Sequence, residues 1–189
     1  MRTHDLIGVL LAGGQSRRMG QDKALLDWHG QPLIEHMIAT LHAVGIAHVK
    51  ISGNRPEYDG IVDAQPGGGP IIGLLSVAQT LLDTELLVVP VDMPRLSVGL
   101  LQQLLDAPAS EAVRFGELAL PMRLRLDDHS RAVLRDVAAL AGRERSLLAL
   151  QARLKVQSLP MIDVAAIELA NCNHPHEWQR ALTSPMEPP

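Results

Sequence analysis

The chain has 189 residues, of which 47% are hydrophobic, 20% charged and only 2% aromatic, with a formal net charge of −4. This length suits one domain with a largely aliphatic core, and the acidic balance argues against a general nucleic-acid binder. A single cysteine excludes an intrachain disulfide, and no stretch reaches the ~20 apolar residues of a membrane span. We therefore expect a cytoplasmic protein with no nucleic-acid or membrane partner, forming one domain over residues 1–189 with a frayed tail at 184–189.

Short apolar runs alternate with helical patterns in the first half of the chain. Continuous aliphatic character predicts buried strands, and recurrence of apolar residues every three or four positions predicts helices. The predicted strands are Leu6–Ala12, Ala47–Ser52, Gly60–Ala64 and Glu85–Asp92. Helices are predicted from Pro32 to near Gly45, after the glycine-rich turn Gln65–Pro70, and after Ser97, which is a typical N-cap residue.

The second half is less regular. Glu111–Leu126 predicts two strands joined around Gly116, and Lys155–Pro160 predicts a late strand. Helices are predicted near Ser130–Leu140, Arg145–Leu154 and His174–Leu182. Strands separated by helices favour parallel pairing with right-handed crossovers, so we expect an α/β domain of Rossmann-like type, with a mostly parallel central sheet flanked by helices. In such a sheet the ligand crevice lies at the carboxyl ends of the strands.

The segment after the first predicted strand combines glycines with basic residues. Gly13 and Gly14 would let backbone N–H groups approach an anion, Arg17 and Arg18 can donate paired hydrogen bonds to phosphate, and Lys23 adds a point charge. This pattern favours a polyphosphate cradle, although a plain strand-to-helix turn with solvated basic residues is the simpler alternative. The spacing fits neither the G-x-x-x-x-G-K-[ST] loop nor the G-x-G-x-x-G dinucleotide motif.

Carboxylates follow two of the other predicted strands. Asp92 stands at the end of the most hydrophobic strand, where a carboxylate could hold a Mg²⁺ bound to phosphate oxygens, or could simply be a turn or cap residue. Asp63 could contact a nucleotide, lie near the metal, or be a surface turn acid. The run Ser52–Arg55 could touch a base or ribose, and Gln65–Pro70 suits an anion or a base edge as well as a plain turn.

The run "LAGGQSRRMGQDK" (Leu11–Lys23) resembles the signature of nucleotidyltransferases with the sugar-nucleotide pyrophosphorylase type of fold. The whole chain is similar to the molybdenum cofactor guanylyltransferase family, the molybdopterin-guanine dinucleotide biosynthesis protein A family. Further support comes from "SGNRPE", "GGPIIGLLSV", "PVDMP" and "NCNHPHEW", so the resemblance spans Leu11 to Trp178. It implies that GTP and molybdopterin cofactor react to give the guanine dinucleotide form and pyrophosphate.

The resemblance also implies residue roles. Leu11, Ala12 and Gly13 would contact guanine or ribose, and Gly14, Arg18 and Lys23 would face the triphosphate. Asp63 would touch the nucleotide, as would Ser52, which stands where the family often has Asn. Asp92 would hold Mg²⁺, and Asn171 and Asn173 would face the pterin. Gly14 supports guanine, because the related cytidylyltransferases more often carry "LAAG". The apolar stretch before Pro121, where the family commonly has His or Gln, leaves the acceptor less defined than the nucleotide.

In the reaction that the resemblance implies, a terminal phosphate of the acceptor attacks the α-phosphorus of GTP. A phosphate oxyanion is already ionised at neutral pH, so catalysis would be positioning and charge neutralisation by Arg18, Lys23 and Asp92-bound Mg²⁺. Alternatives are a related enzyme that uses CTP or another phosphorylated acceptor, and a non-catalytic GTP-binding module; the glycine spacing disfavours an NAD-dependent dehydrogenase. The family further implies transient contact with molybdenum-enzyme partners, and we expect a monomer or weak oligomer.

Overall fold

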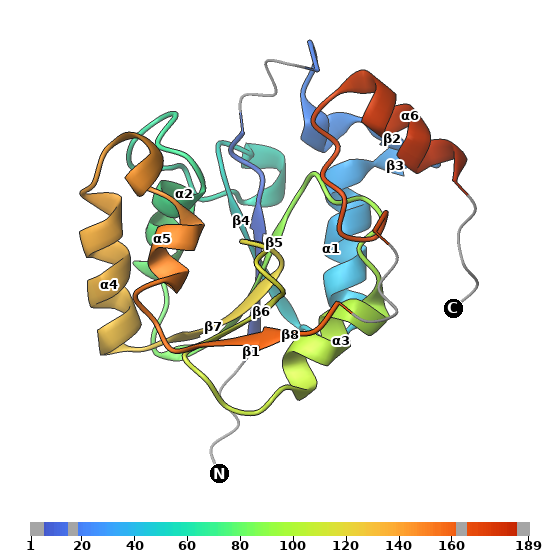
Figure 1. Cartoon of the computed structure of the whole chain (residues 1–189). Helices are drawn as coiled ribbons and strands as arrows, with labels where there is room; N and C mark the ends of the chain where they lie inside the picture. The colour runs from blue at the N-terminus through green and yellow to red at the C-terminus, as the bar shows by residue number, and fades with distance from the viewer. Residues whose placement is uncertain (1–5, 15–18, 162–165, 185–189) are drawn as a thin grey trace.

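A computed structural model describes residues 6–14, 19–161 and 166–184. A six-stranded sheet, ordered β4-β1-β5-β7-β6-β8, forms the centre of the molecule (Figure 1). Its strands are β1 (Leu6–Leu11), β4 (His48–Ser52), β5 (Thr84–Pro90), β6 (Ala112–Phe115), β7 (Met122–Leu126) and β8 (Val156–Leu159).

Strand β1 lies between β4 and β5 and is parallel to both. Strand β7 is antiparallel to β5 and β6, while β8 is parallel to β6. The expected mostly parallel α/β sheet is therefore confirmed, with β7 as the strand that runs against its neighbours. Its direction follows from the short connection 116–121, which joins β6 to β7 without a crossover helix.

Helices cover both faces of the sheet. Figure 1 shows α2, α4 and α5 on one face and α1 and α3 on the other, while α6 lies beside a small β2–β3 hairpin. Two of the helices, α3 and α4, start at side-chain caps: Ser97 accepts from the Leu100 amide, and Asp127 accepts from the Ser130 amide. The helices are α1 (Leu33–Ala43), α2 (Pro70–Ala78), α3 (Val98–Asp106), α4 (Asp128–Ala138), α5 (Leu147–Gln151) and α6 (Pro175–Thr183). The hairpin strands are β2 (Asp27–Trp28) and β3 (Gln31–Pro32), and short 3₁₀ helices are η1 (Lys23–Leu25), η2 (Pro56–Tyr58) and η3 (Gly142–Glu144).

Alternate residues of the central strands point into two separate hydrophobic cores. In β1, Leu10 packs into the core under α1 and α3, and Val9 packs into the core under α2 and α4. In β5, Leu87 packs into the first of these cores and Leu86 into the second. A strand that is buried on both faces reads as a continuous apolar run, which is the pattern from which these strands were predicted.

Two predictions about local structure need correction. Gly60–Ala64 is not a strand: a single bridge joins Ile61 to Ser52, and the Ile61 amide donates to the Ile51 carbonyl at 2.8 Å. Sequence reasoning also gave no sign of the β2–β3 hairpin before α1. Of the predicted tail at 184–189, only Ser184 belongs to the described residues.

Over the described ranges, no helix combines the length and the apolar character that a membrane crossing requires.

Candidate active site

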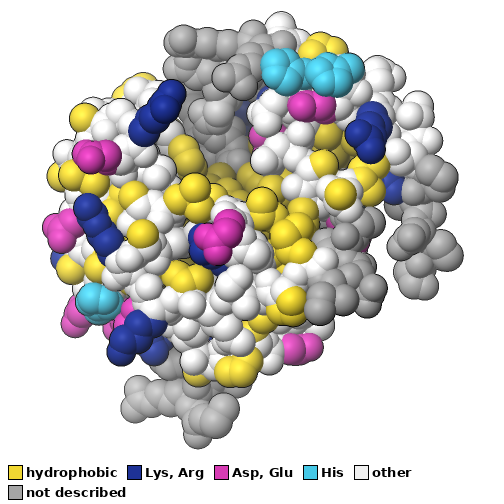
Figure 2. Space-filling view, in the orientation of Figure 1, with side chains coloured by type: hydrophobic (Ala, Val, Ile, Leu, Met, Phe, Trp, Pro, Cys, Tyr) yellow, Lys and Arg dark blue, Asp and Glu magenta, His cyan; other side chains and the backbone are white. Residues whose placement is uncertain are grey.

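A cavity of about 860 Å³ opens at the carboxyl edge of the sheet, where β1, β4 and β5 end. Figure 2 shows the surface hollowed near the centre of this view, with hydrophobic side chains visible in the hollow. Every candidate residue that the structure describes lines this cavity: Leu11, Ala12, Gly13, Gly14, Lys23, Ser52, Asp63, Asp92, Asn171 and Asn173. Arg18 lies outside the described residues, as does Arg17.

Lys23 joins two segments that are distant in the sequence. Its Nζ lies 3.2 Å from Asp92 Oδ2 and donates to Asn173 Oδ1 at 2.7 Å. The side chains of Lys23 and Asp92 are only 13% and 23% exposed, so their ion pair is partly shielded from water. Asp92 is further tied to the C-terminal segment, because the Cys172 amide donates to its backbone carbonyl at 2.8 Å. A cation and a carboxylate are thereby fixed next to each other at the cavity wall.

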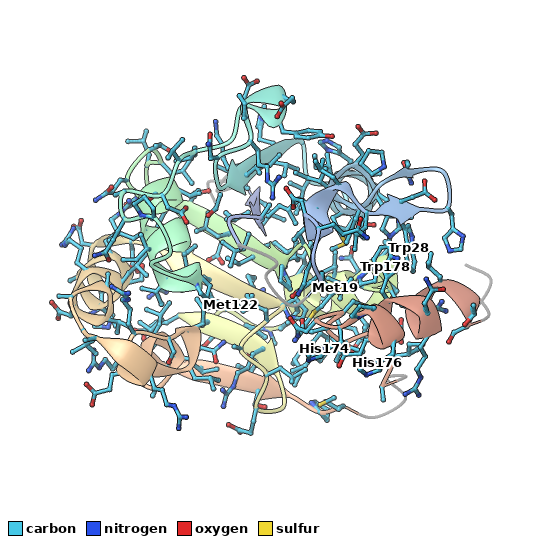
Figure 3. All side chains as sticks on the ribbon, turned by 90° about the horizontal axis from the view of Figure 1, so that it is seen from above. Met19, Trp28, Met122, His174, His176 and Trp178 are labelled. Carbon is cyan, nitrogen blue, oxygen red and sulfur yellow. The ribbon has the colours of Figure 1, made fainter. Side chains whose placement is uncertain are left out.

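The C-terminal segment is anchored by aromatic side chains. Trp178 of α6 packs on Trp28 of the hairpin with ring centroids 5.5 Å apart, and both side chains are buried. Figure 3 shows the two rings side by side, with His174 and His176 at the start of α6. Glu177 accepts hydrogen bonds from the amides of Asn173 and His174. These contacts fix the backbone that presents the Asn173 side chain to Lys23.

The two glycines after β1 have different surroundings. A Cβ at Gly13 would lie 2.9 Å from Asp63 Oδ2, and a Cβ at Gly53 would lie 2.7 Å from the Gly13 Cα, so these backbones touch. At Gly14 an added Cβ would have no atom of the described residues within 4 Å. Gly53 is therefore required by the backbone packing, and a side chain at Gly13 would displace the Asp63 carboxylate, whereas no described atom restricts a side chain at Gly14.

Ser52 and Asp63 form a pair beside these glycines. The Ser52 hydroxyl donates to Asp63 Oδ1 at 3.1 Å. Burial raises the pKa of Asp63 above its ordinary value, and the Ser52 hydrogen bond partly opposes the rise. Gly73 of α2 allows this pair to form, because a Cβ there would lie 2.2 Å from Ser52 Oγ. The result is a hydrogen-bonding group at the cavity that is held by three separate segments.

Sequence reasoning missed the partnership of Arg55 with Asp22, both of which line the cavity. Arg55 Nη2 donates to Asp22 Oδ1 at 2.8 Å, and Nη1 donates to Asp22 Oδ2. The guanidinium holds the pKa of Asp22 below its usual range. The run Ser52–Arg55 was considered for contact with a base or ribose, but a single sequence could not indicate that its arginine reaches back to the signature segment.

One part of the cavity lining is largely apolar. It is formed by Leu118, Ala119 and Leu120 after β6 and by Leu147 and Leu148 at the start of α5. Asn171 and Asn173 border the same cavity from the C-terminal segment. The cavity therefore has a polar half around Lys23 and Asp63 and an apolar half around the 118–120 segment.

Solved structures share this fold. A nucleotidyl transferase from Methanothermobacter thermautotroptrophicus aligns with a TM-score of 0.73 at 18% identity, covering 94% of this chain and 95% of the other. Molybdopterin-guanine dinucleotide biosynthesis protein A from Archaeoglobus fulgidus aligns with a TM-score of 0.74 at 21% identity, covering 93% and 96% of the two chains. Residues 8–158 match the MobA-like NTP transferase domain. By fold and domain, the chain is of the nucleotidyltransferase class.

Curated relatives narrow the class to one family. The chain is 50% identical to a molybdenum cofactor guanylyltransferase from Xanthomonas euvesicatoria over 176 residues, which cover 93% of each chain. It is 32% identical to the protein of that name from Shewanella amazonensis, over 93% of this chain and 96% of the other. The chain belongs to the molybdenum cofactor guanylyltransferase family. The resemblance carried by the Leu11–Lys23 signature is thus confirmed.

Proposed function

We propose that the protein transfers GMP from GTP to molybdopterin cofactor and releases pyrophosphate. The observation that carries the proposal is the convergence of Lys23, Asp92 and Asn173 at one cavity wall, in a member of this family. The cavity, at about 860 Å³, is large enough for a nucleotide together with part of a second ligand.

In the proposed reaction, an oxygen of the acceptor's terminal phosphate attacks the α-phosphorus of GTP. The new bond joins that oxygen to the α-phosphorus, and the bond between the α-phosphorus and the oxygen bridging to the β-phosphate breaks in line with it. The electron pair leaves with pyrophosphate. The attacking oxygen is already an anion, so the protein needs to position two anions and neutralise their charge rather than abstract a proton.

Lys23 suits this task because its ammonium contacts both Asp92 and Asn173, which come from distant segments of the chain. It contacts Asp92 on the nucleotide side and Asn173 on the side proposed for the acceptor. Gly14 leaves room for phosphates beside it, and Ser52 and Asp63 supply hydrogen-bonding groups for the nucleoside. Arg18 remains part of the proposal as a second cation for the triphosphate.

Asp92 is the residue proposed to hold Mg²⁺. Within the described parts of the chain, no three His, Cys, Asp or Glu side chains are grouped to hold a metal ion. A single carboxylate such as that of Asp92 fits Mg²⁺, which is commonly bound through one or two carboxylates together with substrate phosphates and water. When bound, the ion would neutralise charge on the phosphates and orient the leaving group. Asp92, at present paired with Lys23, would then share its carboxylate between two cations.

The deciding assay is pyrophosphate release from GTP, Mg²⁺ and molybdopterin, compared with CTP and ATP in place of GTP. We expect release with GTP, and a strong decrease in Asp92→Asn with unchanged thermal unfolding. Asp136→Asn on the exposed face of α4 is the matched control and should behave as wild type. Comparable turnover with CTP would instead support the alternative that the protein is a cytidylyltransferase. GTP binding without release in the presence of molybdopterin would favour the non-catalytic module.

The two asparagines provide a second test, which addresses the acceptor. We expect Asn171→Ala to raise the KM for molybdopterin more than the KM for GTP. Asn173→Ala should do the same and in addition lower kcat, because it removes the acceptor of the 2.7 Å hydrogen bond from Lys23. Equal weakening of both substrates in Asn171→Ala would contradict its assignment to the acceptor.

A further inference from the structure

The side chain of Arg55 contacts both described ends of the signature segment. Arg55 lies in the short connection after β4 and is the residue before η2. Its Nε and Nη2 donate to the Ala12 carbonyl at 3.3 and 3.1 Å, and its two terminal nitrogens donate to the carboxylate of Asp22. The Arg55 side chain is only 13% exposed, so these bonds form largely away from water.

Each of these two partners controls a different part of the site. Ala12 continues β1 and is held by its amide, which donates to the Ser52 carbonyl at 2.9 Å. Asp22 caps η1, because its Oδ1 accepts from the Ala24 amide at 3.1 Å, and Lys23 is the first residue of that short helix. One guanidinium therefore connects the end of β1 to the residue that caps the short helix beginning at Lys23.

The geometry requires arginine in particular. Four hydrogen bonds leave one planar group in two directions, toward a carbonyl and toward a carboxylate, and a lysine ammonium cannot reproduce that fork. The backbone of Arg55 is itself fixed, since its carbonyl accepts from the amides of Tyr58 and Gly60 at 3.0 and 2.9 Å. A Cβ at Gly60 would lie 2.8 Å from the Arg55 Cβ, so this turn is closely packed.

We propose that Arg55 is a positioning residue that acts through Asp22 to hold Lys23 at its place beside Asp92, without itself binding the phosphates. The proposal rests on the proposed function in that Lys23 is taken to face the triphosphate. The ionised state of Asp22, whose pKa the guanidinium lowers, keeps the connection intact across the physiological range.

The test compares Arg55→Lys, Asp22→Asn and the double variant in the full chain. GTP affinity is measured by calorimetry, kcat and KM by pyrophosphate release, and folding by thermal unfolding. Asp22→Asn keeps an oxygen that can accept from Ala24 but loses the charge. Arg125→Lys is the matched control, because Arg125 pairs with Asp127 at 2.7 Å on a more exposed surface, at the far end of β7.

We expect Arg55→Lys to lower kcat/KM for GTP by about 10- to 100-fold, since small displacements of a catalytic group have effects of that size. Asp22→Asn should have a similar effect, and the double variant should be no more than about twofold worse than the worse single variant, because both break the same connection. Arg125→Lys should match wild type, and all variants should remain folded.

Three outcomes would overturn the proposal. If Asp22→Asn binds GTP more tightly than wild type, Asp22 competes with the phosphates for the Arg55 guanidinium, and Arg55 is a phosphate ligand. If the two single effects multiply in the double variant, the residues act separately. If folded Arg55→Lys keeps wild-type GTP affinity and kcat/KM, the connection has no role in the site. Calorimetry with GTP gives these answers even if wild type releases no pyrophosphate, so failure of the proposed function can be distinguished from failure of this inference.

Discussion

Gly73→Ala perturbs the nucleotide side of the cavity through a single added atom. The new Cβ would stand 2.2 Å from Ser52 Oγ and 3.3 Å from Asp63 Oδ1, so the Ser52 hydroxyl has to turn to another rotamer and lose its hydrogen bond to Asp63. Loss of a hydrogen bond in a buried place costs about 1–3 kcal/mol. Alanine in place of glycine within a helix returns about 1 kcal/mol. The net expectation is a loss of about 1 kcal/mol, or a fall in Tm of about 2–4 °C for a chain of this size.

The same substitution should change sign when Ser52 is first replaced by alanine. The atom at 2.2 Å is then gone. The new Cβ keeps a tight contact with Asp63 Oδ1 at 3.3 Å, which a small movement of the carboxylate relieves once its Ser52 partner is absent, and an ordinary van der Waals contact with the Ser52 Cβ at 3.4 Å. On the Ser52→Ala background we therefore expect Gly73→Ala to stabilise the protein by up to about 1 kcal/mol. Urea unfolding of the four proteins measures both steps. An equal loss on the two backgrounds would refute the reasoning, because the effect would not pass through the Ser52 hydroxyl. The KM for GTP should rise in Gly73→Ala.

Three further outcomes are expected. Gly14→Ala should not lower the Tm, because no described protein atom lies within 4 Å of the added Cβ, but it should raise the KM for GTP, and Gly14→Val should raise that KM further. The control Gly99→Ala, in α3, should leave the KM unchanged. An unchanged KM in the Gly14 variants would remove Gly14 from the nucleotide side. Lys23→Ala should lower kcat by about 10²–10³-fold while changing GTP affinity less, since the lysine charge matters most as pyrophosphate leaves. A large loss of GTP affinity in calorimetry with little change in kcat would contradict this role. Asp63→Asn should raise the Tm at pH 7, because burial raises the pKa of Asp63 above 3.8 and the ionised carboxylate therefore destabilises the native state above that raised pKa. The gain in Tm should vanish as the pH falls below 3.8. A gain that persists at pH 3.5 in scanning calorimetry would point to another cause.

The sequence was sufficient for the elements that carry the site. Buried strands such as Leu6–Leu11 read as continuous aliphatic runs because both of their faces are covered. Their shared direction then predicted that residues after each strand meet at one edge, as Lys23 and Asp92 do across 69 positions. Local chemistry was also enough for the Ser97 cap of α3.

What the sequence could not predict depends on contacts between distant segments. The position of β7 between β5 and β6 depends on its pairing with β5, which lies more than 30 residues earlier in the chain. Gly60–Ala64 forms only a bridge at Ile61, because its partner β4 ends at Ser52. The pairing of Arg55 with Asp22 spans 33 residues and has no local periodicity. The sequence pattern predicts backbone contact with an anion at Gly13, and the resemblance predicts contact with guanine or ribose, but neither could indicate that Gly13 packs against Asp63 and Gly53.

Because Trp28 packs on Trp178, the intrinsic tryptophan fluorescence of the protein reports on one defined place in the fold. The chain has two tryptophans, and both belong to this one corner, where the hairpin after Lys23 meets the helix after Asn173. Indole emission and the near-ultraviolet circular dichroism of the ring pair therefore describe the seating of the C-terminal helix rather than an average over the molecule. A change in tryptophan emission on addition of a ligand would therefore indicate that the ligand affects the hairpin or the C-terminal helix, the two parts of the chain next to Lys23 and Asn173.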